Sequence, residues 1–356
     1  MTNPIWKNEE QFGYALRNLY HRYGYIPYKM SRFEAYDLYV RNKDFLVSDQ
    51  IITFSDRSGR LLALKPDVTI SIVKNAPEEK DVVQKVYYQE NVYRDYREIL
   101  QTGLECVGDL GDYEIAEVVL LAAKSLQLLG GRWVLDISHM GLLSAVLESS
   151  TLNREQQMQA MEYLHRKNYQ ELKALCREKD ACRKLQAVAS CRGGREALEN
   201  LEAVLTEPEE VQALAQLKGL WDILETYGCG DSVRLDFSVG NNMRYYSGVV
   251  FRGYLEGIPA SVLSGGQYDN LPRKMGRNAK AIGFAIYLGL LADLNRREDA
   301  FDVDTVILHD GSVDPTALMA AAEAAERDGT VLVTRQLPRI RNWKHLIRFE
   351  KGGRVE

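Results

Sequence analysis

Near its start the chain carries apolar residues at the spacing of one helix face. They are Phe12, Leu16, Leu19, Tyr20 and Tyr23. This spacing predicts an amphipathic helix over residues 8–23, with Asn8 as a candidate N-cap. Gly24 follows the last apolar position and ends the predicted helix.

Shorter apolar runs bounded by turn residues come next, which is the pattern of strands. Residues 51–64 predict a hairpin that turns at Ser58-Gly59. The further elements predicted in this part are strands over 82–88 and 98–107, a helix over 115–129 that ends at Gly130-Gly131, and a strand over 133–137.

The pattern changes after about Ser138. Residues 142–227 are rich in Leu, Ala, Glu, Gln, Lys and Arg and show helical periodicity, which predicts an all-helical insertion. Strand patterns then return over 233–239, through 251 and over 261–263, and a helix is expected from about Ile282 to Leu294. The expected domains are a core of residues 1–138 and 231–296, interrupted by a helical insertion of residues 139–230.

A polar break at 295–299 indicates a linker to a last, small domain over 300–356. That domain is predicted to hold a strand over 305–308, a helix over 315–327, a strand over 330–333, and one more strand near 345–349. Strands grouped on both sides of a helical insertion favour an α+β fold with a mainly antiparallel sheet flanked by helices, and a small C-terminal α/β unit.

Composition is that of an ordinary globular protein. Hydrophobic residues make up 46% and charged residues 27%, and the net charge of −5 provides no global attraction to phosphate. The five cysteines form no Cys-x-x-Cys pair, so neither a disulfide framework nor a zinc site is expected. With no signal-peptide pattern and no run of 18 apolar residues, we expect a cytoplasmic protein.

Two short polar groups are candidates for ligand contacts. Pro66 favours an extended path on which Asp67 and Thr69 point the same way along a strand edge and can grip an ammonium group. A solvated turn is the alternative. On the strand over 98–107, Gln101 and Glu105 share one face, and Gly103 between them leaves room for a small ligand. A solvated strand face is the alternative there.

Aromatic residues provide a third group. Tyr245, Tyr246 and Tyr268 could line a slot for a flat ring, although in a chain with 20 tyrosines ordinary packing is the alternative for each. Gly265-Gly266 lacks the spacing of a phosphate loop. The five histidines are scattered and form no metal pattern, so neither a metal nor a cofactor is expected.

The order of these motifs resembles the family of histidyl-tRNA synthetase and its paralogue, the regulatory subunit of ATP phosphoribosyltransferase. Residues 56–60 and 64–69 resemble the family's Asp-Arg-x-Gly-Arg and Leu-Arg-Pro-Glu-Gly-Thr motifs. Residues 101–105, 265–269 and 281–286 resemble the later motifs. The resemblance covers about residues 8–138 and 231–294 and implies a class II aminoacyl-tRNA synthetase-like fold.

The resemblance also implies roles for residues of a histidine pocket. Asp67 and Thr69 would hold the α-amino group, Gln101 the main-chain groups, and Glu105 the imidazole N–H, while Tyr246 and Tyr268 would flank the imidazole with Tyr245 beside them. Arg244 is a candidate partner of the carboxylate. Residues 24–34 resemble motif 1, the dimer-forming element, with Ser31 where its proline is expected.

Arginines that bind ATP in such a synthetase are missing from the aligned positions. Tyr87 and Gln89 stand in place of the Arg-x-Glu of motif 2, Asn241 in place of the catalytic arginine, and Leu290 in place of the motif 3 arginine. Loss of three such donors would remove adenylation. We therefore expect a protein that binds histidine without being an enzyme.

Residues 300–356 are too few for an anticodon-binding domain, so no tRNA partner is expected. The resemblance implies a regulatory subunit of ATP phosphoribosyltransferase that activates a short catalytic subunit and mediates feedback by L-histidine in histidine biosynthesis. It implies a homodimer or a higher hetero-oligomer, away from any membrane. The alternatives are a divergent histidyl-tRNA synthetase and a free-standing histidine-binding module.

Overall fold

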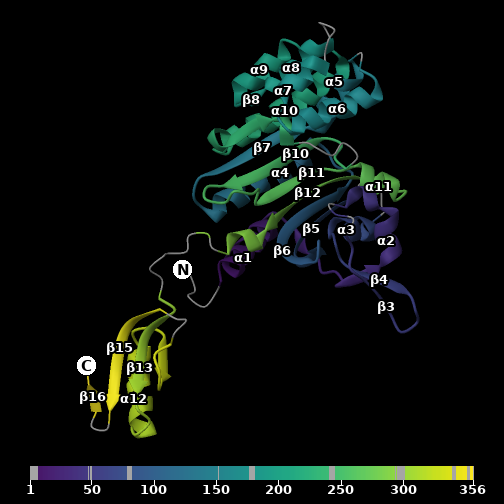
Figure 1. Cartoon of the computed structure of the whole chain (residues 1–356). Coiled ribbons are helices and arrows are strands. Elements are labelled where there is room, and N and C mark those ends of the chain that lie inside the picture. The colour runs from purple at the N-terminus through teal and green to yellow at the C-terminus, as the bar shows by residue number, and fades with distance from the viewer. Residues whose placement is uncertain are drawn as a thin grey trace. The chain divides into compact units, whose positions relative to one another are not determined.

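The computed structural model describes residues 7–355 except 47, 49, 78–81, 151, 176–180, 240–244, 293, 295–300, 339–341 and 351–352. The chain divides into two compact units, Met1–Leu294 and Asn295–Glu356 (Figure 1). Each unit is described by itself. Within the described residues, no helix has the length and apolar character needed to cross a membrane.

A nine-stranded sheet forms the centre of the first unit. Its strands, in spatial order, are β1 (Ile26–Pro27), β5 (Val83–Arg94), β6 (Arg97–Gly108), β12 (Lys280–Tyr287), β11 (Leu263–Gln267), β10 (Val249–Leu255), β7 (Trp133–His139), β9 (Val233–Asp236) and β8 (Arg192–Gly193). Neighbours are antiparallel except at the β1–β5 and β7–β9 pairs. The expectation of a mainly antiparallel α+β fold is confirmed.

The expected helix after Ile282 is wrong, because residues 280–287 form strand β12. Its side chains alternate in size with a period of two. Ile282, Phe284 and Ile286 belong to the apolar core on one face, whereas Gly283 and Ala285 line the other. Only a short 3₁₀ turn, Leu288–Leu291, follows the strand.

Helices α1 (Asn8–Arg22) and α4 (Asp112–Leu129) pack on one face of this sheet. Asn8 is not the N-cap of α1; that position is Lys7. The Asn8 amide instead donates to the carbonyl oxygens of Ala292, at 3.0 Å, and Leu294, at 2.7 Å. Asn8 therefore ties the first helix to the end of the same unit.

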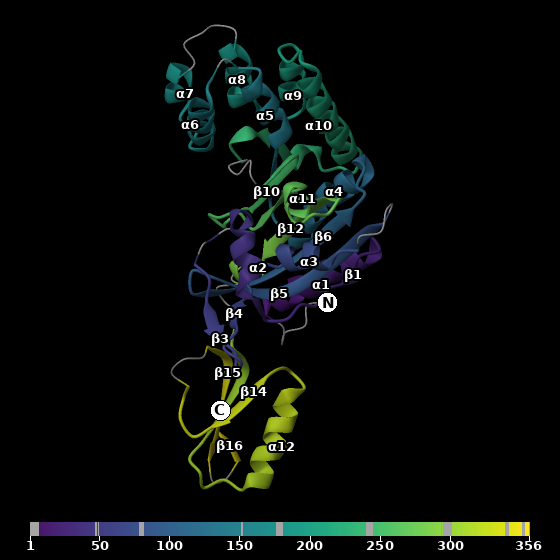
Figure 2. The ribbon, with the colours of Figure 1, turned by 90° about the vertical axis from the view of Figure 1, so that its right-hand side faces the viewer.

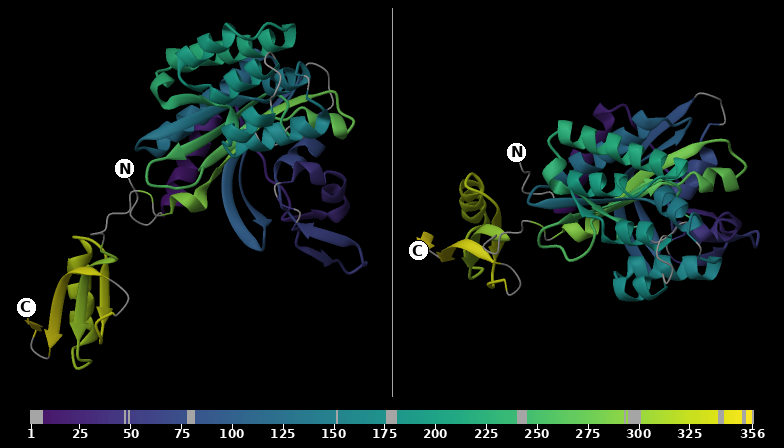
Figure 3. Two further views of the ribbon diagram at one scale, coloured as in Figure 1. Left: turned by 45° about the horizontal axis from the view of Figure 1, so that its top comes forward. Right: turned by 90° about the horizontal axis from the view of Figure 1, so that it is seen from above.

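Beside the main sheet lies a three-stranded sheet of β2 (Phe33–Ala35), β4 (Leu61–Leu64) and β3 (Thr53–Ser55), drawn in purple in Figure 3. Helices α2 (Tyr36–Arg41), α3 (Thr69–Asn75) and α11 (Asn270–Lys274) belong to the same region. Thr69 does not lie on a strand edge, as expected, but begins α3. The Asp67 carboxylate accepts the Ile70 N–H at 2.9 Å and so favours a helix start.

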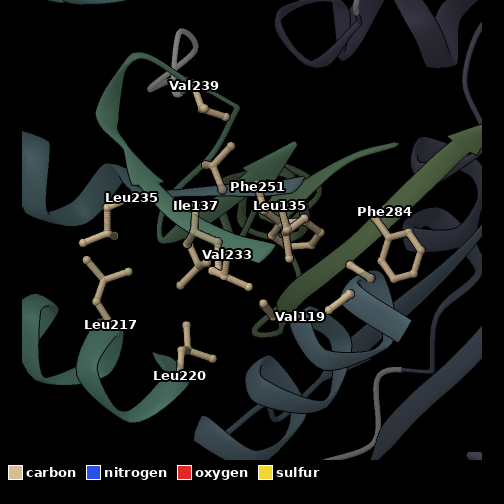
Figure 4. Close-up of a cluster of buried hydrophobic side chains, with 14 of the residues drawn as sticks. Val119, Leu135, Ile137, Leu217, Leu220, Val233, Leu235, Val239, Phe251 and Phe284 are labelled. Atoms are coloured by element: carbon tan, nitrogen blue, oxygen red, sulfur yellow. The ribbon is translucent and has the colours of Figure 1, made fainter. Parts of the chain in front are cut away.

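The expected insertion consists mostly of helices, which gather at one end of the main sheet (Figure 2). They are α5 (Met140–Glu148), α6 (Arg154–His165), α7 (Tyr169–Leu175), α8 (Ala181–Ser190), α9 (Arg195–Glu202) and α10 (Pro208–Thr226). The segment is not all-helical, because strand β8 pairs with β9 at the sheet edge. Leu217 and Leu220 of α10 pack toward strand residues such as Leu235 in one continuous core (Figure 4). The exact domain boundaries stay a prediction.

The second unit carries a four-stranded sheet with the order β14 (Val331–Thr334), β13 (Val303–His309), β15 (Trp343–Glu350) and β16 (Gly353–Val355). Helix α12 (Pro315–Glu326) connects β13 to β14, which run parallel. The predicted strand–helix–strand order is confirmed here. The Asp314 side chain accepts the Ala317 N–H at 3.3 Å and caps this helix.

Candidate functional site

All seven residues expected to contact a ligand line one cavity of about 530 Å³. They are Asp67, Thr69, Gln101, Glu105, Tyr245, Tyr246 and Tyr268. The cavity lies on the face of the main sheet opposite the apolar core that α1 and α4 cover. Its volume is in the range that encloses small organic ligands, roughly 300–1,000 Å³.

Strand alternation places the two polar residues of β6. Gln101 and Glu105 are four positions apart and face the cavity, as predicted, while Leu104 and Cys106 face the apolar core. Gly283 stands opposite Glu105 on β12. A Cβ atom at Gly283 would lie 1.7 Å from a carboxylate oxygen of Glu105, so only glycine leaves room for this carboxyl.

The space above Gly103 is not free for a ligand, contrary to expectation. A Cβ atom at Gly103 would meet the Tyr88 hydroxyl at 2.7 Å and the Phe284 carbonyl at 2.2 Å. Tyr88 stands opposite Gly103 on β5 and fills that space. Gly103 therefore serves the close packing of the tyrosine ring against the sheet, and Tyr88 is itself a wall of the cavity.

Glu105 is 2% exposed and is held by two donors. The Thr69 hydroxyl donates to one oxygen at 2.8 Å, and the Tyr268 hydroxyl donates to the other. Burial raises the pKa of this carboxyl to about 8, although both hydrogen bonds act in the opposite direction. Glu105 is therefore ready to exchange a proton near neutral pH.

Asp67 forms the second acidic group of the cavity. Burial raises its pKa, and the Arg94 guanidinium opposes that rise from 3.4 Å. Arg94 also donates to the Pro66 carbonyl at 2.6 Å. This arrangement fixes both the aspartate and the arginine at the start of α3, within reach of a cationic ligand group.

Three tyrosine rings enclose the same end of the cavity. The ring centroids of Tyr245 and Tyr246 are 4.6 Å apart, and those of Tyr245 and Tyr268 are 5.8 Å apart. Burial raises the pKa of all three hydroxyls, which keeps them neutral and able to donate. Tilted rings at these distances suit contact with another flat ring.

The Gln101 side chain lines the cavity and has a buried amide oxygen. This oxygen accepts no hydrogen bond from any residue that the structure describes, and the residue is 2% exposed. An unpaired buried acceptor costs about 1–3 kcal/mol. A ligand that brings an N–H group into the cavity would remove this cost, so the oxygen marks a point of ligand contact.

The described positions among those aligned with the ATP-binding arginines, Tyr87, Gln89 and Leu290, do not line this cavity. Tyr87 packs toward Tyr20 of α1, and Gln89 lies against Gly13 of the same helix. Because strand residues alternate, Tyr88 between them is the residue of this stretch that lines the cavity. Leu290 is exposed in the turn after β12. Asn241 and Arg244 lie outside the described residues.

Sequence reasoning missed several other residues of the cavity wall: Tyr88, Arg252, Ser264 and Tyr287. A period-two alternation from Val250 on β10 indicates Arg252, and the same alternation from Gly283 on β12 indicates Tyr287. The folded chain also places Arg94, at the end of β5, beside Asp67.

Comparison with known proteins shows the family of the chain. The model of the histidyl-tRNA synthetase family matches residues 2–291. An ATP phosphoribosyltransferase regulatory subunit from Clostridium kluyveri is 30% identical over 297 residues, which cover 79% of this chain and 76% of the relative.

Solved structures show the same fold. An ATP phosphoribosyltransferase regulatory subunit/histidyl-tRNA synthetase from Bacillus halodurans has a TM-score of 0.78 at 25% identity, with 99% of this chain and all of that chain covered. A chain of an ATP phosphoribosyltransferase complex from Thermotoga maritima has a TM-score of 0.63 at 19% identity, covering 79% of this chain and 97% of that one. The fold is therefore that of a class II, histidyl-tRNA synthetase-like protein, and the chain belongs to the family of ATP phosphoribosyltransferase regulatory subunits.

Proposed function

We propose that this chain is a non-catalytic subunit that activates a short catalytic subunit of ATP phosphoribosyltransferase and makes it sensitive to histidine. The observation that carries the proposal is the cavity itself. Two carboxyl groups, an unpaired amide oxygen and three tyrosine rings converge there on a space suited to a small cationic, ring-bearing ligand.

Histidine matches each of these groups. Its ammonium group can lie by Asp67 and the Gln101 oxygen, and its imidazole N–H can donate to Glu105 between the tyrosine rings. The Thr69 hydroxyl donates to Glu105 rather than toward Asp67, so Thr69 supports the binding site by holding the Glu105 carboxyl. A ligand that competes for Glu105 would release Thr69 to contact the ligand.

The relatives' names support this choice of partner. The chain belongs to a family of regulatory subunits, and the Thermotoga maritima structure with the same fold is a complex of the enzyme. Feedback requires that histidine bind one state of such a complex more tightly than another. A coupling of about 1–3 kcal/mol would give roughly 5–150-fold control of affinity.

Calorimetry on the chain tests the pocket. Histidine should bind, and Glu105→Gln should weaken binding by about tenfold or more, since a charge-assisted hydrogen bond contributes about 1.5–3 kcal/mol. Glu98→Gln is a matched control, because Glu98 is exposed at the far end of β6 and does not line the cavity. Equal binding of leucine and histidine would contradict the proposal.

A second assay separates this proposal from a divergent synthetase. A synthetase exchanges pyrophosphate into ATP when histidine is present, and the chain proposed here does not. Exchange within about tenfold of an ordinary synthetase, a barrier difference of about 1.4 kcal/mol, would show that the chain is an enzyme.

A further inference from the structure

The cavity wall contains a second arginine, on a strand that β12 and β11 separate from β6. Arg252 is on β10 and lines the cavity. Its neighbours across the sheet are small, because Ser264 stands opposite it on β11 and Ala285 stands opposite Ser264 on β12. Small side chains on this row leave space over the sheet that the long Arg252 side chain and a ligand can share.

Arg252 has no partner for its charge among the residues that the structure describes. Asp136 is its neighbour by register on β7, yet the Asp136 carboxylate pairs with Arg234 on β9 at 3.2 Å. The guanidinium lies close enough to Tyr246 to pull down the pKa of that hydroxyl, which burial raises. The charge of Arg252 thus acts on Tyr246, which also lines the cavity.

The other cation of the cavity wall is already engaged. Arg94 is bound to the Pro66 carbonyl and to Asp67. An amino acid that enters the cavity carries a carboxylate, and a carboxylate taken out of water is costly unless a cation pairs with it. Of the two arginines among the described residues of the cavity wall, Arg252 is the one whose donors have no partner within the described part of the chain.

We propose that Arg252 binds the α-carboxylate of the amino acid in this cavity. The proposal rests on the proposed function, because it takes that ligand to be histidine. It assigns to Arg252 the role for which the sequence suggested Arg244. The cavity then offers carboxyl groups to the ammonium and imidazole groups and an arginine to the carboxylate, and so selects a free amino acid over analogues without the carboxylate.

The test compares L-histidine with L-histidinol, in which a CH₂OH group replaces the carboxylate. Calorimetry on the full chain should show a preference for histidine of about tenfold or more. Arg252→Gln should weaken histidine binding by that factor and leave histidinol binding within about twofold, so that the preference disappears. Arg252→Lys should restore part of the preference, because it restores the charge.

Arg132→Gln is the matched control. Arg132 directly precedes β7, pairs with Glu256 at 2.6 Å and does not line the cavity, so this variant should keep the full preference. The inference is wrong if Arg252→Gln keeps the preference or if Arg132→Gln loses it equally. Histidine binding that depends on Glu105 but not on Arg252 would overturn this inference alone. Absence of binding by either ligand to the wild-type chain would overturn the proposed function together with it.

Discussion

The carboxyl group of Glu105 is buried, and this burial raises its pKa to about 8 in a cavity that suits a cationic ligand. Below that pH the folded protein holds a proton that the unfolded chain releases above about 4.5, the group's ordinary value. Because the folded state binds more protons in this window, the contribution of Glu105 to stability falls as pH rises from about 4.5 to about 8.

Glu105→Gln tests this titration. Relative to the variant, the wild-type protein should lose up to about 1.4 kcal/mol of unfolding free energy per pH unit between pH 5 and pH 8. Urea unfolding of both proteins at several pH values and one protein concentration measures the difference. A difference that stays constant over this range would show that Glu105 is already ionised in the folded protein.

At the scale of elements, alternation along strands was the informative signal in the sequence. It placed Gln101 and Glu105 on one face of β6, and both line the cavity together with Tyr245, Tyr246 and Tyr268. The same rule, applied to residues 280–287, would have predicted β12 instead of a helix. Apolar runs of this length fit either element by composition, and only the alternation of size separates them.

Contacts between segments that are far apart in the chain could not be predicted from local sequence patterns. The helix that begins at Thr69 depends on the capping of Ile70 by Asp67, and the position of Arg94 depends on the length of β5. Tyr25 was expected at a subunit interface but is buried, where its hydroxyl donates to Glu117 of α4 at 3.2 Å. These positions are set by partners up to about a hundred residues away, which local patterns do not contain.

Packing of β12 against β6 gives a prediction at this scale. Gly283→Ala should destabilise the protein by about 1–3 kcal/mol and weaken histidine binding, because the new Cβ would occupy the place of the Glu105 carboxyl. Gly289→Ala is the control, since a Cβ there would meet nothing within 4 Å. Thermal unfolding and calorimetry measure both effects. Equal behaviour of the two variants would show that the carboxyl moves aside at little cost.

At the scale of the whole molecule, exposed apolar residues of the motif 1 region predict self-association. Ile26 is 59% exposed and Phe33 is 46% exposed, and the Phe33 ring packs on Phe54 with centroids 5.5 Å apart. Such residues on a surface indicate contact with another molecule, and a two-fold dimer is the commonest form.

Light scattering should therefore give about twice the chain mass of 40.5 kDa at micromolar concentration. Phe33→Asp should weaken the dimer, because it places a charge in an apolar interface. Val211→Asp, on an exposed apolar residue of α10, should leave it intact. A wild-type mass equal to one chain would contradict the prediction.

Reconstitution with a short catalytic subunit of ATP phosphoribosyltransferase tests the central claim most directly. Formation of phosphoribosyl-ATP should be weak with the catalytic subunit alone, should rise when this chain is added, and should then fall as L-histidine is titrated. Inhibition should require higher histidine concentrations with Glu105→Gln than with the wild-type chain. Activity that is unchanged by the chain, or activated but insensitive to histidine, would contradict the claim that this protein is a histidine-sensing activator.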